Sequence, residues 1–238
     1  MSVFSIATYD ALIQKINHLL QQIANAVNSF INAVESAASS IPIIGGLIGD
    51  GAKWLLEKLR NLVQEGLNKM EGYLKPAAVP PMMWDDGQTW SQIGQASGST
   101  ASTLSGINAN NGFEWKGIAG GKYTDGVQDQ PTAATTLSNW AGTIMGACDS
   151  IAEGGFGFYA ACGVALVSFA AAVVSAGTGD VPAVIAAAVV MLASIAGALA
   201  SLYFGVQSGT RTLKSVTWNN AAFPGGSWPK ATAETITG

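Results

Sequence analysis

Residues that could carry chemistry are few in this chain of 238 residues, and their spacing does not assemble a catalytic site. The single histidine, His18, stands among glutamine and asparagine residues, with no cysteine near it in the sequence. A serine or threonine nucleophile needs an adjacent base, and proton transfer needs a positioned titratable group. We therefore expect no enzymatic activity, no catalytic residues and no bound cofactor.

Two pairs of acids and one glycine-rich stretch could suggest a site, but each has a simpler interpretation. Asp85 and Asp86 precede a predicted helix, where carboxylates complement the helix dipole. Asp149 and Glu153 are four residues apart and suit a solvated helix end. The stretch 154–157 neither follows a strand nor precedes a lysine, as a phosphate-binding loop would.

The two cysteines, Cys148 and Cys162, are predicted to be buried free thiols. On one helix they would lie about 21 Å apart, which is beyond the reach of a disulfide. Only a chain reversal between Glu153 and Gly157 could bring them together. The chain has no zinc-type Cys/His spacing, and we predict no metal site.

Charged residues make up 11% of the chain, whereas about 25% is typical of soluble domains. A surface with so few charges is expected to be covered by partners, by copies of the same chain or by lipid. The formal charge of −4 gives no basic patch for nucleic acid, which we exclude as a partner.

The most distinctive stretch runs from Phe156 to Val206 and contains one charged residue, Asp180. Each half, 156–176 and 181–206, is long enough to cross a hydrocarbon core as a helix, which takes about 20 residues. This apolar hairpin could be a core pair of a soluble bundle, a buried layer of a homo-oligomer, or a membrane-inserting hairpin. The residues predicted to form its assembly or membrane surface are Gly163, Ala171, Val173, Val184, Ala188, Val190 and Ile195.

The predicted fold is all-α: about six helices, arranged as three sequential hairpins in an elongated bundle, followed by a turn-rich tail. Apolar residues recur every three or four positions from Leu12 to Val34 and from Leu55 to Tyr73, which predicts an amphipathic helical hairpin. We also expect a kink or short break near Pro131.

The predicted organisation has five segments. They are an N-terminal amphipathic hairpin (1–76), a proline-rich linker (77–83), a second hairpin (84–153), the apolar hairpin (154–209) and the tail (210–238). The tail carries three large aromatic anchors, which we expect to dock on the bundle or on a neighbouring chain: Trp218, Phe223 and Trp228.

Residues 84–152 resemble the WXG100-type helical hairpin of type VII (ESX) secretion systems, and the layout of the chain resembles the longer actinobacterial relatives, in which an Ala/Val-rich helical pair follows such a hairpin. The likeness rests on the turn Trp115-Lys116-Gly117, on the residues 118–123 that follow it, and on the apolar seam beyond. In such a hairpin the glycine allows a tight reversal, and the tryptophan seals the end of the interface. The resemblance implies hairpin closure by Trp115 and Gly117.

The resemblance also implies export through a type VII route to the cell surface or medium. A Sec signal peptide is not expected, because the chain begins without a basic segment followed by an apolar run. The export signal of the family, Tyr-x-x-x-Asp/Glu, is absent, so either a helical partner carries it or the translocase does not recognise this chain. Five tyrosines lack an acid four residues on: Tyr9, Tyr73, Tyr123, Tyr159 and Tyr203.

The sequence therefore predicts a non-enzymatic type VII substrate or accessory protein that assembles through its apolar helices into a ring or filament. The alternative is a membrane-associated, pore-forming or membrane-inserting effector that uses the hairpin 156–206. We expect a homo-oligomer in the first case and lipid as the partner in the second.

Overall fold

The computed structural model describes residues 5–39, 45–109, 120, 121, 123, 127–176, 180–217 and 220–229. The described residues are almost entirely helical, and none of them lies in a β-strand. This confirms the predicted all-α class. The predicted count of six helices is not confirmed, because the described residues form five α-helices and one short 3₁₀ turn.

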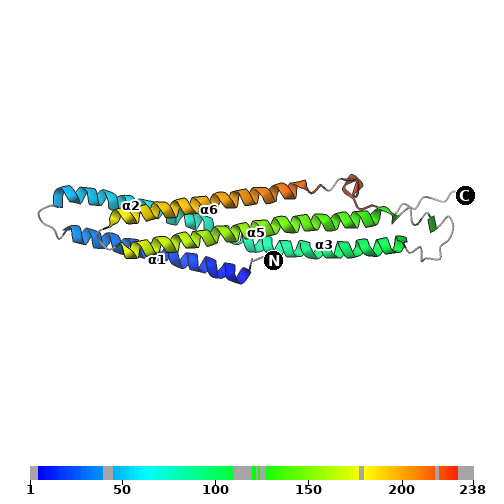
Figure 1. Cartoon of the computed structure of the whole chain (residues 1–238), viewed down its shortest axis with the longest axis horizontal. Coiled ribbons are helices and arrows are strands. Elements are labelled where there is room, and N and C mark those ends of the chain that lie inside the picture. The colour runs from blue at the N-terminus through cyan, green and yellow to red at the C-terminus, as the bar shows by residue number, and fades with distance from the viewer. Residues whose placement is uncertain are drawn as a thin grey trace. The chain divides into compact units, whose positions relative to one another are not determined.

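The helices are long, and Figure 1 shows them coloured in chain order. Their bounds are α1 (Ile6–Ser39), α2 (Gly45–Leu74), α3 (Val79–Ala109), α5 (Asp129–Ser175), α6 (Val181–Ser215) and the 3₁₀ turn η2 (Pro224–Gly226).

Proline marks the beginning of three of these helices. Pro80, Pro131 and Pro182 each lie in a first turn, where a missing N–H removes no intrahelical hydrogen bond. Residue 131 therefore lies in the first turn of α5, directly after a turn at residue 128, which agrees with the predicted short break near Pro131 and not with a kink. Asp180 caps α6, because its Oδ1 accepts a hydrogen bond from the Ala183 N–H at 3.2 Å.

Helix α5 is continuous where the sequence predicts a boundary between two hairpins. It passes through Gly154, Gly155 and Gly157 without interruption. Each interior glycine disfavours a helix by only about 1 kcal/mol relative to alanine, and burial of the flanking side chains can offset that. Cys148 and Cys162 consequently lie on one helix, and both are buried free thiols, as predicted.

The chain divides into two compact units. Unit 1 comprises Met1–Met82 and Ile151–Val206, and unit 2 comprises Met83–Ser150 and Gln207–Gly238. Helices α3, α5 and α6 each contribute residues to both units.

Unit 1 is built from two helical pairs. Helices α1 and α2 pack against each other, and the second half of α5 pairs with α6. Helix α1 runs parallel to α5, since Tyr9 lies beside Tyr159 and Leu12 lies beside Gly163. Met191 joins α6 to α2, because a Cβ at Gly66 would lie 3.0 Å from the Met191 Cε.

The core of unit 1 is apolar and uses all four helices. Its buried side chains include Ile16, Leu19, Ile23, Val27, Phe30 and Val34 of α1; Leu56, Leu59, Val63 and Met70 of α2; Phe158, Tyr159, Cys162, Leu166, Phe169 and Val173 of α5; and Val181, Val184, Ala188, Met191 and Ile195 of α6.

Unit 2 is held together by small residues and by the tail. Helices α3 and α5 run antiparallel, since Gly87 lies beside Asp149 and Gly94 beside Ala141. A Cβ at Gly94 would lie 3.3 Å from the Ala141 Cβ, and the Ser138 hydroxyl donates to the Gly94 carbonyl at 2.8 Å. The two backbones therefore approach closely through glycine, alanine and serine.

Candidate association surface

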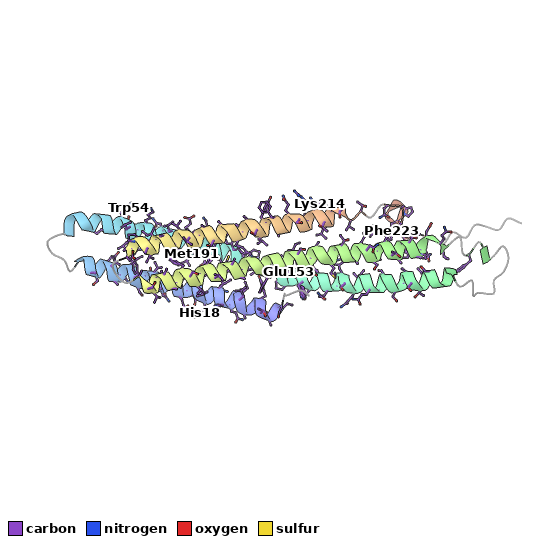
Figure 2. The ribbon with its side chains drawn as sticks, viewed as in Figure 1. His18, Trp54, Glu153, Met191, Lys214 and Phe223 are labelled. Atoms are coloured by element: carbon purple, nitrogen blue, oxygen red, sulfur yellow. The ribbon has the colours of Figure 1, made fainter. Side chains whose placement is uncertain are left out.

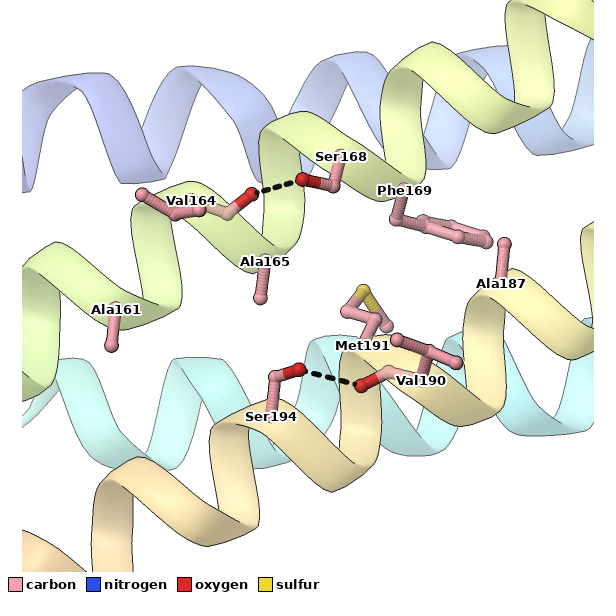
Figure 3. Close-up of a pocket in the computed structure, with 9 residues that line it drawn as sticks. All are labelled: Ala161, Val164, Ala165, Ser168, Phe169, Ala187, Val190, Met191 and Ser194. Carbon is pink, nitrogen blue, oxygen red and sulfur yellow. Dashed lines mark hydrogen bonds between the residues drawn. The ribbon is translucent and has the colours of Figure 1, made fainter.

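The outer side of the α5–α6 pair carries a shallow apolar groove. Its volume is about 510 Å³, and no charged side chain lines it. Figure 3 shows the nine lining side chains, of which Ala161 and Ala165 of α5 point towards α6, and Met191 and Ser194 of α6 point towards α5. The nine are Ala161, Val164, Ala165, Ser168, Phe169, Ala187, Val190, Met191 and Ser194.

Around this groove, large apolar side chains are open to solvent. The exposed fraction is 68% for Val164, 79% for Val174 and 64% for Val190. Val167 and Val189 are also exposed. We call these five valines the outer face of the hairpin. A set of large apolar side chains left open to solvent in this way is typical of an interaction site, because water disfavours their exposure.

The hydroxyl groups on this face are satisfied within their own helices. Ser168 donates to the Val164 carbonyl at 2.9 Å, and Ser194 donates to the Val190 carbonyl at 2.8 Å (Figure 3). Such bonds to the carbonyl four residues earlier leave no hydroxyl proton that needs water or a partner. The face can therefore meet a purely apolar medium without leaving these donors unsatisfied.

The hairpin is also free of charge along its length. Between residues 154 and 206 the only charged side chain is Asp180, which occupies the cap of α6 at the tip. Two exposed aromatic rings, Tyr203 and Phe204, lie near the other end of the apolar stretch, with centroids 5.9 Å apart. Aromatic side chains at the ends of apolar helices are typical of membrane–water interfaces.

In the described part of the chain, α5 and α6 are the two helices whose length and hydropathy would allow them to cross a membrane. A core helix of a soluble protein passes the same test, so burial is the informative quantity. In the most apolar 18-residue stretch of each helix, 44% of the residues are buried in α5 and 28% in α6. Large apolar side chains of both helices, among them Val164, Val174 and Val190, are therefore left exposed by the described part of the chain.

The predicted surface residues divide between the core and the outer side. Ala171 and Val190 are exposed. Five others are buried inside unit 1: Gly163, Val173, Val184, Ala188 and Ile195. The sequence reasoning missed four exposed valines, Val164, Val167, Val174 and Val189, because no charged residue and only a few serines mark the outer side of these helices. The buried positions of α1 and α2 were identifiable, since polar residues alternate with them.

A cluster of aromatic rings lies where the first turns of α1 meet α5. Tyr9 contacts Phe156 and Tyr159, with centroids 6.5 and 5.7 Å apart. Phe158 contacts Tyr159 at 5.0 Å and Tyr73 of α2 at 5.6 Å. Burial, followed by the proximity of Tyr159, raises the pKa of Tyr9 well above its usual value. We call these five residues the aromatic cluster.

Both buried phenols donate to the chain segment at the end of α2. The Tyr9 hydroxyl donates to the Ala77 carbonyl at 2.7 Å, and the Tyr159 hydroxyl donates to the Tyr73 carbonyl at 2.6 Å. Carbonyls at a helix end have no intrahelical partner, so these bonds satisfy groups that would otherwise need water. They connect α1 and α5 to the segment that leads from α2 into α3.

The tail anchors fall partly within the described residues. Phe223 is buried and stacks on Trp140 of α5, with centroids 4.9 Å apart, while Trp228 meets Phe223 at 5.9 Å and is more exposed. The Asn220 side chain accepts hydrogen bonds from the backbone N–H groups of residues 222 and 223, which fixes the turn. Trp218, Trp115 and Gly117 lie outside the described residues, as does the predicted hairpin turn.

Of the groups considered for chemistry, Asp86, Cys148 and Asp149 lie near one another in unit 2, whereas His18 belongs to unit 1. His18 and Glu153 are exposed (Figure 2). Burial, followed by the charges of Asp86 and Asp149, raises the pKa of the Cys148 thiol. A buried thiol in such surroundings is a poor nucleophile. In the part of the chain that the structure describes, no three acidic, cysteine or histidine residues gather as a metal site would require.

Neither the sequence nor the structure of this chain matches a known protein family, a curated protein or a solved structure.

Proposed function

We propose that this is a non-enzymatic, membrane-active protein whose α5–α6 hairpin enters lipid. The observation that carries the proposal is the outer face of the hairpin: five exposed valines on two long helices that have no charged residue between 154 and 206 apart from Asp180. A protein–protein interface of ordinary kind contributes about one hydrogen bond per 100–200 Å². The serine hydroxyls of the groove are already committed to their own helices, which favours lipid over a polar partner.

The experiment uses two lysine substitutions on the outer face, Val164→Lys and Val190→Lys. Both side chains are exposed, so the fold should tolerate the change. A lysine at the centre of a bilayer opposes insertion by about 2.5–3.5 kcal/mol, which corresponds to roughly a hundredfold in affinity. We expect the unmodified protein to sediment with neutral phosphatidylcholine vesicles and to release an entrapped dye, and each lysine variant to lose both activities.

Matched controls place the same charge on exposed polar positions outside the hairpin. Gln22→Lys on α1 and Asn61→Lys on α2 should bind vesicles as the unmodified protein does. Neutral lipid is needed because anionic headgroups would attract any added lysine. Vesicle binding that survives Val164→Lys and Val190→Lys, or an unmodified protein that ignores vesicles, contradicts the proposal.

Self-assembly is the second candidate, and the composition of the groove favours it. Ala161, Ala165 and Ala187 leave space for a neighbouring helix to approach closely, and apolar burial would stabilise the contact by about 25 cal/mol per Å² before association costs. Sedimentation velocity without lipid separates the two candidates. A defined oligomer that ignores vesicles, and that Val190→Lys dissociates, identifies assembly as the role of this face.

Export through a type VII route, with a helical partner carrying the signal, is a further part of the proposal. Its support is the sequence resemblance and the antiparallel α3–α5 contact through Gly94 and Ala141. Comparison of culture supernatants from isogenic hosts with and without a type VII translocase tests it. Equal amounts in both supernatants contradict this route.

A further inference from the structure

We propose that the aromatic cluster of Tyr9, Tyr73, Phe156, Phe158 and Tyr159 is a lock that keeps the α5–α6 hairpin on the α1–α2 pair and must open before the hairpin enters lipid. This inference rests on the proposed membrane function. The cluster joins residues of α1, α2 and α5 within unit 1.

Separation of the two helical pairs is required by the charges of α2. The outer side of α2 carries exposed ionic groups, including Glu57, Lys58 and Arg60. Such groups are excluded from hydrocarbon, so α2 cannot accompany the hairpin across a membrane. The inner face of the hairpin, by contrast, is as apolar as its outer face: Leu166 and Phe169 of α5, and Val184 of α6, face the core.

Apolar packing alone is a weak restraint on this movement. Lipid chains are about as apolar as leucine, so a buried valine or leucine of the hairpin exchanges one apolar contact for another. The hydrogen bonds of the aromatic cluster, by contrast, cannot be replaced by contacts with lipid chains. If Tyr159 moved into lipid, its hydroxyl would lose the Tyr73 carbonyl and find no acceptor outside its own helix.

The phenols therefore oppose release in a way that the core side chains do not. The Tyr9 hydroxyl adds a second restraint, because it ties the first turns of α1 to the Ala77 carbonyl while its ring packs on Tyr159. Helix α3 also packs closely on α5 next to the aromatic cluster, since a Cβ at Gly155 would lie 2.4 Å from Pro80 Cγ.

Two variants, Tyr159→Phe and Tyr9→Phe, test the lock with the rings retained. The matched control is Ser138→Ala in unit 2, which removes a hydroxyl-to-carbonyl bond of similar length between α3 and α5. The first readout is amide hydrogen exchange of residues 156–175 in buffer without lipid. The second is the rate of dye release from neutral phosphatidylcholine vesicles.

We expect both phenylalanine variants to exchange roughly tenfold faster over residues 156–175, as the loss of a buried hydrogen bond implies. Dye release should accelerate by a similar factor, whereas Ser138→Ala should change neither rate. Unchanged rates in both tyrosine variants, or equal acceleration in Ser138→Ala, overturn the lock. Faster exchange in the two tyrosine variants alone, with no variant releasing dye from the vesicles, supports the lock and contradicts the membrane function instead.

Discussion

Within unit 1, the α1–α2 pair and the α5–α6 pair share one core but present different surfaces to the outside. Helix α1 is covered outwardly by amides such as Gln22, and α2 by ions such as Glu65, which forms an i, i+4 ion pair with Lys69. The outer face of the hairpin carries valines in the equivalent places. Water therefore specifies one orientation for α1 and α2, but it penalises every orientation of α5 and α6.

The difference shows how one pair of helices can suit two environments. An amphipathic pair is stable only with its apolar seam covered and its polar side wet. A pair that is apolar all round can be covered by α1 and α2 on one side and still require a second cover on the other. Lipid provides that second cover without requiring any polar complement.

The strongest test of this comparison uses two valines of α6 that differ in burial. Val184 is fully buried and Val190 is 64% exposed. Val184→Asp should reduce the free energy of unfolding by about 4 kcal/mol or more, because an acid without a partner is placed in the core. Val190→Asp should change it by less than about 0.5 kcal/mol. Urea unfolding of both variants measures the contrast.

A large loss in both variants would contradict the comparison. It would mean that the outer face is itself part of a packed interior, as in a stable assembly. Sedimentation of the unmodified protein would then show that assembly directly.

The sequence identifies the all-α class and the buried seam of α1, and the structure confirms both. Ile16, Ile23 and Val27 are predictable because polar residues separate them at helical spacing. In the hairpin, Val184 and Val190 are equivalent by sequence, and only the position of α1 and α2 decides which is covered. No local pattern could have distinguished them.

The continuity of α5 was equally hidden from sequence reasoning. Three glycines between residues 154 and 157 predict a boundary by helix propensity. The structure explains Gly155 by close contact with Pro80, so this glycine is a packing position inside a helix. Propensity describes a residue by itself, whereas this site depends on a partner 75 positions away in the chain.

Two nearby glycines of α5 test the difference between the packed and the open side of the hairpin. A Cβ at Gly155 would lie 2.4 Å from Pro80, whereas nothing lies within 4 Å of a Cβ at Gly157. Gly155→Ala should destabilise unit 1 by about 1–3 kcal/mol through overpacking. Gly157→Ala should stabilise it by about 0.5–1 kcal/mol through helix propensity.

Thermal unfolding of the two alanine variants, side by side, provides the measurement. Both variants have the same composition change on the same helix, so unfolded-state effects largely cancel. Stabilisation by Gly155→Ala would mean that α3 does not pack on α5 at this point.

The last prediction concerns the effect of pH on stability through Tyr9 of the aromatic cluster. Because burial raises the pKa of Tyr9 in the folded protein, the unfolded chain loses this proton first, at about pH 10. The stability that depends on this protonated phenol is complete below pH 10 and falls as the pH rises further, by at most about 1.4 kcal/mol per pH unit. Tyr9→Phe should remove that part of the slope between pH 10 and 11, measured by urea unfolding. An unchanged slope would mean that the Tyr9 hydroxyl is accessible to base in the folded state, and that α1 does not hold the hairpin as firmly as its contacts indicate.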